Sequence, residues 1–309
     1  MTTAPFVVVG ESLVDVVAAQ DGSRSAAVGG SPMNVAVGLA RLDVPAVLVT
    51  RIGDDDHGRA VAEHVRDSGV DLHSASVVPG SRTSTATARL DSRNAAAYEF
   101  DLAWDLRPLD LPDCSGLHVG SLGAVLSPGR AAVRDLVRQA RERDVFVSYD
   151  PNVRPAFVTD PRQSWRDVAG LAAESRLVKV SDEDLQALRP DEPVDALAAE
   201  LLTGLETELV VVTSGDAGAR AFREAFEVAA PAPPTAVVDT VGAGDSFMAA
   251  MLAILSSWDL LRPGMLVALG RDHVCTLLEG AMAAAAVTCS RRGANPPRRL
   301  ELPPTWPAS

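Results

Sequence analysis

The feature that most constrains this chain is a regular alternation of short, β-branched apolar runs with longer amphipathic stretches. This pattern is typical of a parallel sheet with helices on its faces. It predicts an α/β fold, doubly wound, with a mostly parallel sheet flanked by helices. The predicted strands cover residues 6–9, 47–52, 117–120, 145–150, 177–180 and 209–213.

Several helix ends can be read from the sequence between these strands. The Ser-Pro pairs at residues 31–32 and 127–128 each predict a helix start, because serine caps helices and proline suits the first helical position. Asp56 and Gly69 mark the two ends of a third predicted helix.

Two regions, residues 13–28 and 83–101, interrupt the alternation. The second region is expected to form two strands around a turn at residues 92–94. Together they predict a small β lid, inserted in a single α/β domain that spans residues 1–309. Such a lid would cover the edge of the sheet where open α/β sheets bind ligands, although two decorative hairpins would give the same pattern.

Charge and length exclude several classes of protein. The 309 residues can bury a full core. They include 28 Lys and Arg against 41 Asp and Glu, a formal net charge of −13. This balance argues against nucleic acid or an anionic membrane surface as a partner, because both select basic patches. A small anionic ligand stays possible where local amides or a cation offset the field.

The three cysteines, Cys114, Cys275 and Cys289, lie far apart and predict neither a disulfide framework nor a zinc site. The N-terminus lacks the basic region of a signal peptide, and the apolar windows are too short to span a bilayer. We therefore expect a cytoplasmic protein.

The most informative stretch is DTVGAGDSF at residues 239–247, which leads into an apolar helix. A Gly-Ala-Gly turn before a helix presents unpaired backbone N–H groups at the positive end of the helix dipole, where a phosphate can bind. Asp245 lies in the first helical turn and can face that anion, or it can simply cap the helix. A dinucleotide-binding motif is excluded, because Phe247 stands where a small residue is needed.

This stretch resembles the C-terminal signature of the ribokinase-like, pfkB-type carbohydrate kinase family. Other motifs of that family follow in its order and spacing: GGSPMNVA at 29–36, DPNVRP at 150–155, VKVSDED at 178–184, TSGDAG at 213–218 and RGA at 292–294. The resemblance covers essentially the whole chain. It implies a doubly wound domain with a β lid, and transfer of the γ-phosphoryl group of ATP to a sugar hydroxyl.

The resemblance also implies catalytic roles for the glycine-rich turn. Asp245 would be the general base that accepts the proton of the sugar hydroxyl. Gly242, Ala243 and Gly244 would supply the backbone amides that stabilise charge in the transition state.

Five residues are implied in sugar binding. Asn34 and Asp15 would form hydrogen bonds with sugar hydroxyls. Gly29 and Gly30 would let the backbone approach the ligand closely, and Arg154 would lie near the sugar or the transferred phosphate. The alternatives from local sequence are an ordinary turn at the two glycines and solvated side chains at Asp15 and Arg154.

Four further residues, Lys179, Thr213, Gly215 and Gly218, would bind the nucleotide by the same resemblance. Asp184 would help to hold Mg²⁺ through water, since Mg²⁺ keeps several waters and few protein ligands. Helix capping by this acidic segment is the alternative.

The stretch at residues 286–297 resembles the fructokinase branch, so D-fructose is the predicted substrate. The alternatives are 2-keto-3-deoxygluconate or another sugar or nucleoside as acceptor, and a sensor that binds sugar or nucleotide without turnover. A carboxylated acceptor would need the lid arginines Arg82, Arg89 and Arg93.

Two departures from the family concern the sugar substrate and the monovalent cation. Met282 and Pro297 stand where many ribokinases carry Asn and Ser, which argues against ribose and against strong activation by K⁺. ATP, Mg²⁺ and a sugar are therefore the expected ligands, with K⁺ a weaker expectation. An exposed lid face also predicts a homodimer.

Overall fold

A computed structural model of the chain describes residues 4–18, 24–90 and 96–306. Its largest sheet contains β1 (Phe6–Val9), β4 (Ala46–Val49), β6 (Asp71–Leu72), β10 (Gly116–Gly120), β11 (Phe146–Asp150), β12 (Leu177–Ser181), β13 (Leu209–Thr213), β14 (Ala219–Arg223) and β15 (Phe226–Ala230). The strand order is β15-β14-β13-β12-β11-β10-β1-β4-β6. Strands from β13 to β6 pair in parallel, and β14 and β15 form an antiparallel edge.

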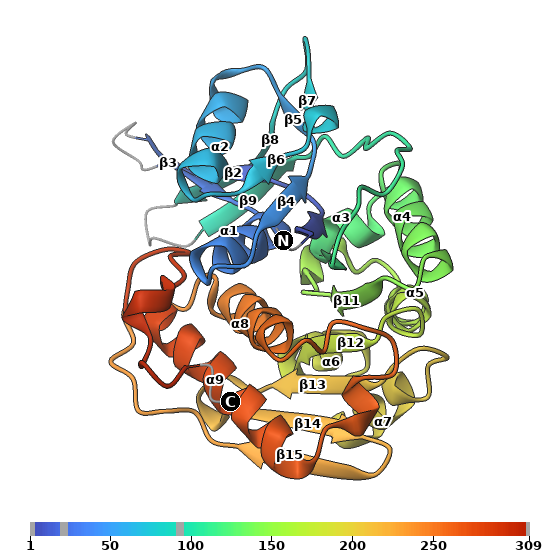
Figure 1. Ribbon diagram of the computed structural model, residues 1–309. Helices are drawn as coiled ribbons and strands as arrows, with labels where there is room; N and C mark the ends of the chain where they lie inside the picture. The colour runs from blue at the N-terminus through green and yellow to red at the C-terminus, as the bar shows by residue number, and fades with distance from the viewer. Residues whose placement is uncertain (1–3, 19–23, 91–95, 307–309) are drawn as a thin grey trace.

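Helices cover both faces of this sheet (Figure 1). One layer contains α1 (Ser31–Arg41), α8 (Ala243–Ser257) and α9 (Arg271–Cys289), and the other contains α3 (Ser121–Val125), α4 (Arg130–Glu142), α5 (Pro161–Ala172), α6 (Asp182–Leu188) and α7 (Val194–Leu202). Short 3₁₀ helices are η1 (Ser74–Ser76), η2 (Pro155–Phe157), η3 (Gly215–Ala217), η4 (Leu266–Ala268) and η5 (Arg299–Glu301). The predicted doubly wound α/β fold is therefore confirmed.

The lid is a separate four-stranded sheet in the order β3-β2-β8-β9. Its strands are β2 (Leu13–Ala18), β3 (Arg24–Gly29), β8 (Ser84–Leu90) and β9 (Ala96–Asp101). The two interrupting regions meet where β2 and β8 pair in parallel, with Asp15 opposite Ala86. The turn predicted at 92–94 lies outside the described residues.

The remaining elements join the lid to the main sheet. They are α2 (Asp56–Asp67) and the two-stranded sheet of β5 (Ile52–Gly53) and β7 (Val77–Val78). The single strand predicted over residues 47–52 is thus wrong, because the chain leaves the main sheet after β4 and pairs with β7 through β5.

The helix starts predicted at Ser31 and Asp56 are confirmed, whereas the start predicted at residues 127–128 is wrong by two residues, and the capping residues differ from the prediction. α1 has Gly30 as its N-cap, and the Ser31 side chain makes no capping hydrogen bond. α4 begins at Arg130, because the segment before it is held by a 3.0 Å bond from the Gly129 amide to the Trp104 carbonyl. α2 is capped by Asp55, one residue before Asp56, whereas its predicted end at Gly69 fits the observed φ of 82°.

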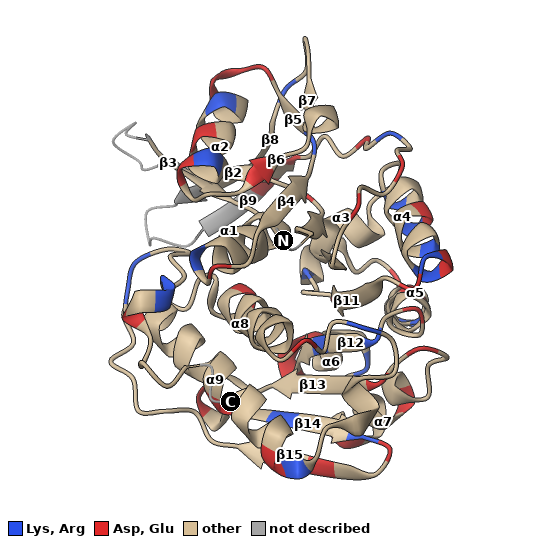
Figure 2. Ribbon diagram, in the orientation of Figure 1, with Lys and Arg blue, Asp and Glu red and all other residues tan. Residues whose placement is uncertain are grey.

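Helix α8 lies in the middle of the molecule, and every residue from Asp245 to Leu255 is buried. Charged residues gather instead on outer helices such as α2 and α4 (Figure 2). Within the described ranges, no helix is long and apolar enough to cross a membrane.

Close packing of α1 on α8 gives a first test. A Cβ on Gly38 would lie 2.6 Å from Ala249 Cβ, whereas a Cβ on Gly170 of α5 would meet nothing within 4 Å. We expect Gly38→Ala to lower the free energy of unfolding by about 1–3 kcal/mol through overpacking. The control Gly170→Ala should raise it by about 0.5–1 kcal/mol through helix propensity. Urea denaturation measures both, and a stabilised Gly38→Ala variant would contradict the close contact.

Candidate active site

The N-terminus of α8 is shaped by Gly242, its N-cap, whose φ of 76° lies in the left-handed region that favours glycine. A Cβ at this position would also lie 2.7 Å from Ala294 Cβ. Asp239 fixes the turn, because its carboxylate accepts the amide hydrogens of Val241 at 3.1 Å and Gly293 at 2.8 Å. These hydrogen bonds lower the pKa of Asp239. The turn therefore holds its amides at the positive end of α8.

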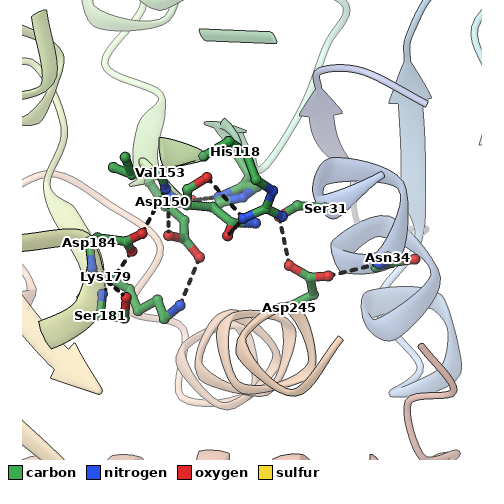
Figure 3. A network of polar contacts seen from close by, with 12 residues as sticks. Ser31, Asn34, His118, Asp150, Val153, Lys179, Ser181, Asp184 and Asp245 are labelled. Atoms are coloured by element: carbon green, nitrogen blue, oxygen red, sulfur yellow. Dashed lines mark hydrogen bonds and ion pairs between the residues drawn. The ribbon is translucent and has the colours of Figure 1, made fainter. Parts of the chain in front are cut away.

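Asp245, in the first turn of α8, is 7% exposed and points toward α1. Its Oδ1 accepts a 2.6 Å hydrogen bond from Ser31 Oγ, and its Oδ2 accepts a 2.8 Å bond from Asn34 Nδ2 (Figure 3). α8 has no side-chain cap. The capping alternative is therefore not what the structure shows, and the carboxylate is oriented by two donors from another helix.

A buried ion pair approaches the same turn from the sheet. Lys179, near the end of β12, places Nζ 3.0 Å from Oδ2 of Asp150, the last residue of β11. A Cβ on Gly244 would lie 2.9 Å from Lys179 Nζ, so the ammonium group lies against the glycine turn. Figure 3 shows Asp245 and Lys179 on two sides of the first turn of α8.

The charges of Asp150, Lys179 and the neighbouring carboxylates shift one another's pKa values. Burial raises the pKa of Asp150 to about 6, and the Lys179 charge limits that rise. Burial alone would lower the pKa of Lys179, but the carboxylates of Asp150, Asp184 and Asp245 outweigh it, so the net shift is upward. Lys179 therefore stays a cation in the protein.

Asp184 lies on the far side of this cluster from α1. Its two carboxylate oxygens accept the amide hydrogens of Val153 at 2.7 Å and Ser181 at 3.0 Å. Ser181 Oγ in turn accepts the Asp184 amide hydrogen at 3.0 Å, which completes a capping box on α6. The capping alternative for this acidic segment is thus observed, and the predicted role of Asp184 with a metal stays a prediction.

The residues predicted to bind nucleotide lie along a cleft of about 470 Å³ between the end of β13 and helices α8 and α9. Thr213, Gly215 and Gly218 form one wall, and Ala243 and Gly244 form the base. Met282 lies on the α9 side. The structure therefore brings three of the predicted nucleotide residues to the same cleft as the glycine turn, with Lys179 against Gly244.

The residues predicted to bind sugar come from the lid, from α1 and its start, and from the loop after β11. A Cβ on Gly29 would lie 2.5 Å from Asp15 Oδ2, so the carboxylate of Asp15 lies over that glycine. Desolvation raises the pKa of Asp15, and the charge of Arg154 opposes the rise. Arg154 is exposed, and its Nη1 donates to the Asn152 carbonyl at 3.2 Å. Asn34 donates one hydrogen bond to Asp245, and its predicted contact with a sugar hydroxyl stays a prediction.

Four buried residues of this region were not assigned roles from the sequence. Ser31 was interpreted only as a cap, and Asp150 only as part of a motif. His118 lies 3.0 Å from Ser148 Oγ, and burial together with the Lys179 charge lowers its pKa to about 3, so it is neutral. Glu11 follows β1. Of these four residues, only Asp150 could have been assigned to the site from the sequence, because it ends a buried strand and the ends of strands line such sites.

The comparisons with known proteins agree with this geometry. A family model described as pfkB family carbohydrate kinase matches residues 4–300. A fructokinase of Klebsiella pneumoniae is 33% identical over 289 residues, covering 90% of this chain and 92% of the relative. A fructokinase of Rhizobium leguminosarum bv. trifolii is 35% identical over 263 residues, covering 82% and 80%.

A solved structure of a fructokinase also resembles this chain in fold. A fructokinase double mutant from Vibrio cholerae O395, with fructose, ADP and potassium ion bound, is 26% identical and superposes with a TM-score of 0.78 over 94% of each chain. Since the family model and the relatives cover nearly the whole sequence, this chain belongs to the pfkB family of carbohydrate kinases.

Proposed function

We propose that this sugar kinase is a fructokinase, which transfers the γ-phosphoryl group of ATP to a hydroxyl of D-fructose. The curated relatives described above are fructokinases aligned over at least 80% of each partner. The observation that carries the chemistry is the Asp245 carboxylate, held by Ser31 and Asn34 beside a glycine turn. A protein that only senses sugar has no need of such an oriented base.

In this proposal the sugar lies between the lid and α1, near Asp15, Asn34 and Arg154. Asp245 accepts the proton of the attacking hydroxyl, because its carboxylate is oriented and close to that space. The amides of residues 242–244 and the Lys179 ammonium stabilise the negative charge of the transferring phosphoryl group. Asn34 and Ser31 orient the base before the sugar arrives.

The apolar cleft along β13, α8 and α9 would take the adenosine part of ATP, with its phosphates directed to the turn. Asp184 and Asp150 lie close enough for their charges to interact, and carboxylate oxygens are ligands that Mg²⁺ accepts. When bound with the nucleotide, Mg²⁺ would neutralise phosphate charge. We propose that Asp184 holds it through water.

A carboxylated acceptor such as 2-keto-3-deoxygluconate has less support. Of the lid arginines, Arg82 forms an ion pair with Asp101 at 2.6 Å on the surface of the lid. Arg93 and the side chain of Arg89 lie outside the described part of the structure. The homodimer through the lid stays a prediction.

Substrate choice is tested with a coupled ADP-release assay over several acceptors. We expect fructose to give a higher kcat/KM than ribose, adenosine or 2-keto-3-deoxygluconate, because the relatives that cover this chain are fructokinases. A panel led by ribose or by the keto acid would show that the substrate is wrong while leaving the kinase assignment intact.

The role of the base is tested with Asp245→Asn, which keeps the size of the side chain. Asparagine cannot accept the hydroxyl proton, so we expect kcat to fall by about 10²- to 10⁴-fold with KM values little changed. The matched control is Asp272→Asn, since Asp272 is an exposed aspartate in the first turn of α9. Near-normal turnover of Asp245→Asn would remove Asp245 from the mechanism.

The metal is tested by calorimetry and by chelation. Both oxygens of Asp184 already accept amide hydrogens, and the described residues contain no group of three or more potential metal ligands. We therefore expect Mg²⁺ to bind weakly without nucleotide, and EDTA to abolish turnover reversibly. Tight Mg²⁺ binding by the protein alone would contradict this arrangement.

A further inference from the structure

A short segment after α9, residues 293–296, lies between the glycine turn and α1. On the side of the turn, the Gly293 amide donates a 2.8 Å hydrogen bond to the Asp239 carboxylate. A Cβ on Gly242 would lie 2.7 Å from Ala294 Cβ and 2.8 Å from Ala294 Cα. Because Asp239 fixes the glycine turn and Gly242 is the N-cap of α8, this turn rests directly on the segment.

Helix α1 holds the other side of the segment. Pro296 is buried, and its Cβ would lie 3.8 Å from a Cβ on Gly38, the residue at which α1 packs on α8. Arg41, the last residue of α1, donates two hydrogen bonds from Nη1, to Asn295 Oδ1 at 2.5 Å and to the Pro296 carbonyl at 2.7 Å. One guanidinium nitrogen therefore holds both a side chain and the backbone of the segment.

The charges around Arg41 leave it bound to these neutral acceptors. The carboxylate of Glu301 accepts hydrogen bonds from Arg291 Nη2 at 2.5 Å and from the Arg298 amide at 2.7 Å. Burial lowers the pKa of Arg41, the two neighbouring arginines add to this effect, and the charge of Glu301 opposes it. Arginine stays protonated in proteins, and hydrogen bonds from a charged donor are stronger than those between neutral groups. The two contacts of Arg41 should therefore hold the segment firmly.

The two ends of α1 act on different parts of the active site. Its first turn places Ser31 and Asn34 on the Asp245 carboxylate. The helix spans 11 residues from Ser31 to Arg41, which places its two ends about 15 Å apart. Arg41 therefore acts on the glycine turn through the segment and not on the base through Ser31.

We infer that Arg41 is a positioning residue of this kinase: it anchors residues 293–296 on α1, and Gly293 and Ala294 of this segment hold the glycine turn in place. The inference rests on the proposed function and adds to it a residue that does not line the nucleotide cleft. The amides of the turn act mainly on the charge that develops in the transition state. Loosening the turn should therefore lower kcat more than it raises either KM.

The test uses variants on both sides of the contact. Arg41→Ala removes both hydrogen bonds, whereas Arg41→Lys keeps a cation whose single nitrogen can donate to the two acceptors that Nη1 uses. Asn295→Ala removes the side-chain acceptor and leaves the Pro296 carbonyl. The double variant Arg41→Ala/Asn295→Ala completes a cycle that measures the coupling of the two side chains.

The matched control is Arg143→Ala. Arg143 is the C-cap of α4 and also donates one hydrogen bond to a carbonyl, that of Leu111 at 2.6 Å, and one to a side chain, that of Asp113 at 2.9 Å. These contacts lie outside the active site. For every variant we would measure kcat, KM for the sugar, KM for ATP and Tm, with the acceptor that the wild type uses best.

We expect Arg41→Ala to lower kcat by about 10- to 100-fold, because a displacement of about 1 Å in a catalytic group causes losses of this size. KM for the sugar should change little, since Ser31 and Asn34 still hold Asp245. Arg41→Lys should recover part of kcat, and Asn295→Ala should lose less than Arg41→Ala. The double variant should be no slower than Arg41→Ala. Arg143→Ala should lower Tm without changing kcat.

Three results would overturn the inference: a wild-type kcat in Arg41→Ala, losses of the two single variants that simply add in the double variant, or an equal loss of kcat in Arg143→Ala. If Arg41→Ala does not fold, Arg41→Lys and Asn295→Ala decide, and a wild-type kcat in both would contradict the role of Arg41. If fructose is a poor acceptor but another sugar shows the expected loss of kcat, the substrate proposal fails and the role of Arg41 stands.

Discussion

The contact between α1 and α8 is the constraint on which the active site depends. At Gly38 the two helices leave no space for a side chain. This close approach brings Ser31 and Asn34 within hydrogen-bond distance of Asp245. A carboxylate that is 7% exposed needs such donors, because a buried charge without partners is costly. Helix packing therefore determines both the burial and the direction of the base.

The buried charges explain how an acidic protein can prepare a site for a nucleotide. Asp150 pairs with Lys179 at 3.0 Å, and the charges of Asp150, Asp184 and Asp245 all raise the pKa of that ammonium group. Burial raises the pKa of Asp150 to about 6, and the charges of Asp184 and Asp245 add to the rise. Phosphates entering this region meet the Lys179 ammonium and the amides of the glycine turn, which are the local positive groups. A divalent cation would relieve the remaining repulsion between phosphates and carboxylates.

Much of the fold and part of the site could be predicted from the sequence, because both are encoded in local patterns. The apolar runs predicted six strands of the main sheet, one of them extended too far at residues 50–52, and DTVGAGDSF predicted the turn at α8. Ser31 shows where local rules fail: its hydroxyl follows the pattern of a cap, yet a distant carboxylate competes for it and Gly30 becomes the N-cap. The antiparallel edge of β14 and β15 was missed, since a short hairpin of mixed polarity carries a weak signal.

The burial of Glu11 could not have been predicted from local sequence patterns, because it depends on contacts between segments that are distant in the sequence. A glutamate after a strand and a glycine is usually solvated, whereas Glu11 is 4% exposed and its carboxylate accepts the amide hydrogen of Gly123 in α3. Burial at that position depends on the topology of the whole sheet, because β1 and β10 are neighbours in the sheet and this brings Gly123, just after β10, against Glu11. Ser121, which follows β10, has a φ of 52°, and Asn152, after β11, has a φ of 39°. Such left-handed non-glycine residues cost energy and persist where the surrounding structure holds them. The strained residues Ser121 and Asn152 and the buried carboxyl of Glu11 thus lie at the same edge of the sheet, where a fold gives up stability to leave room for a ligand.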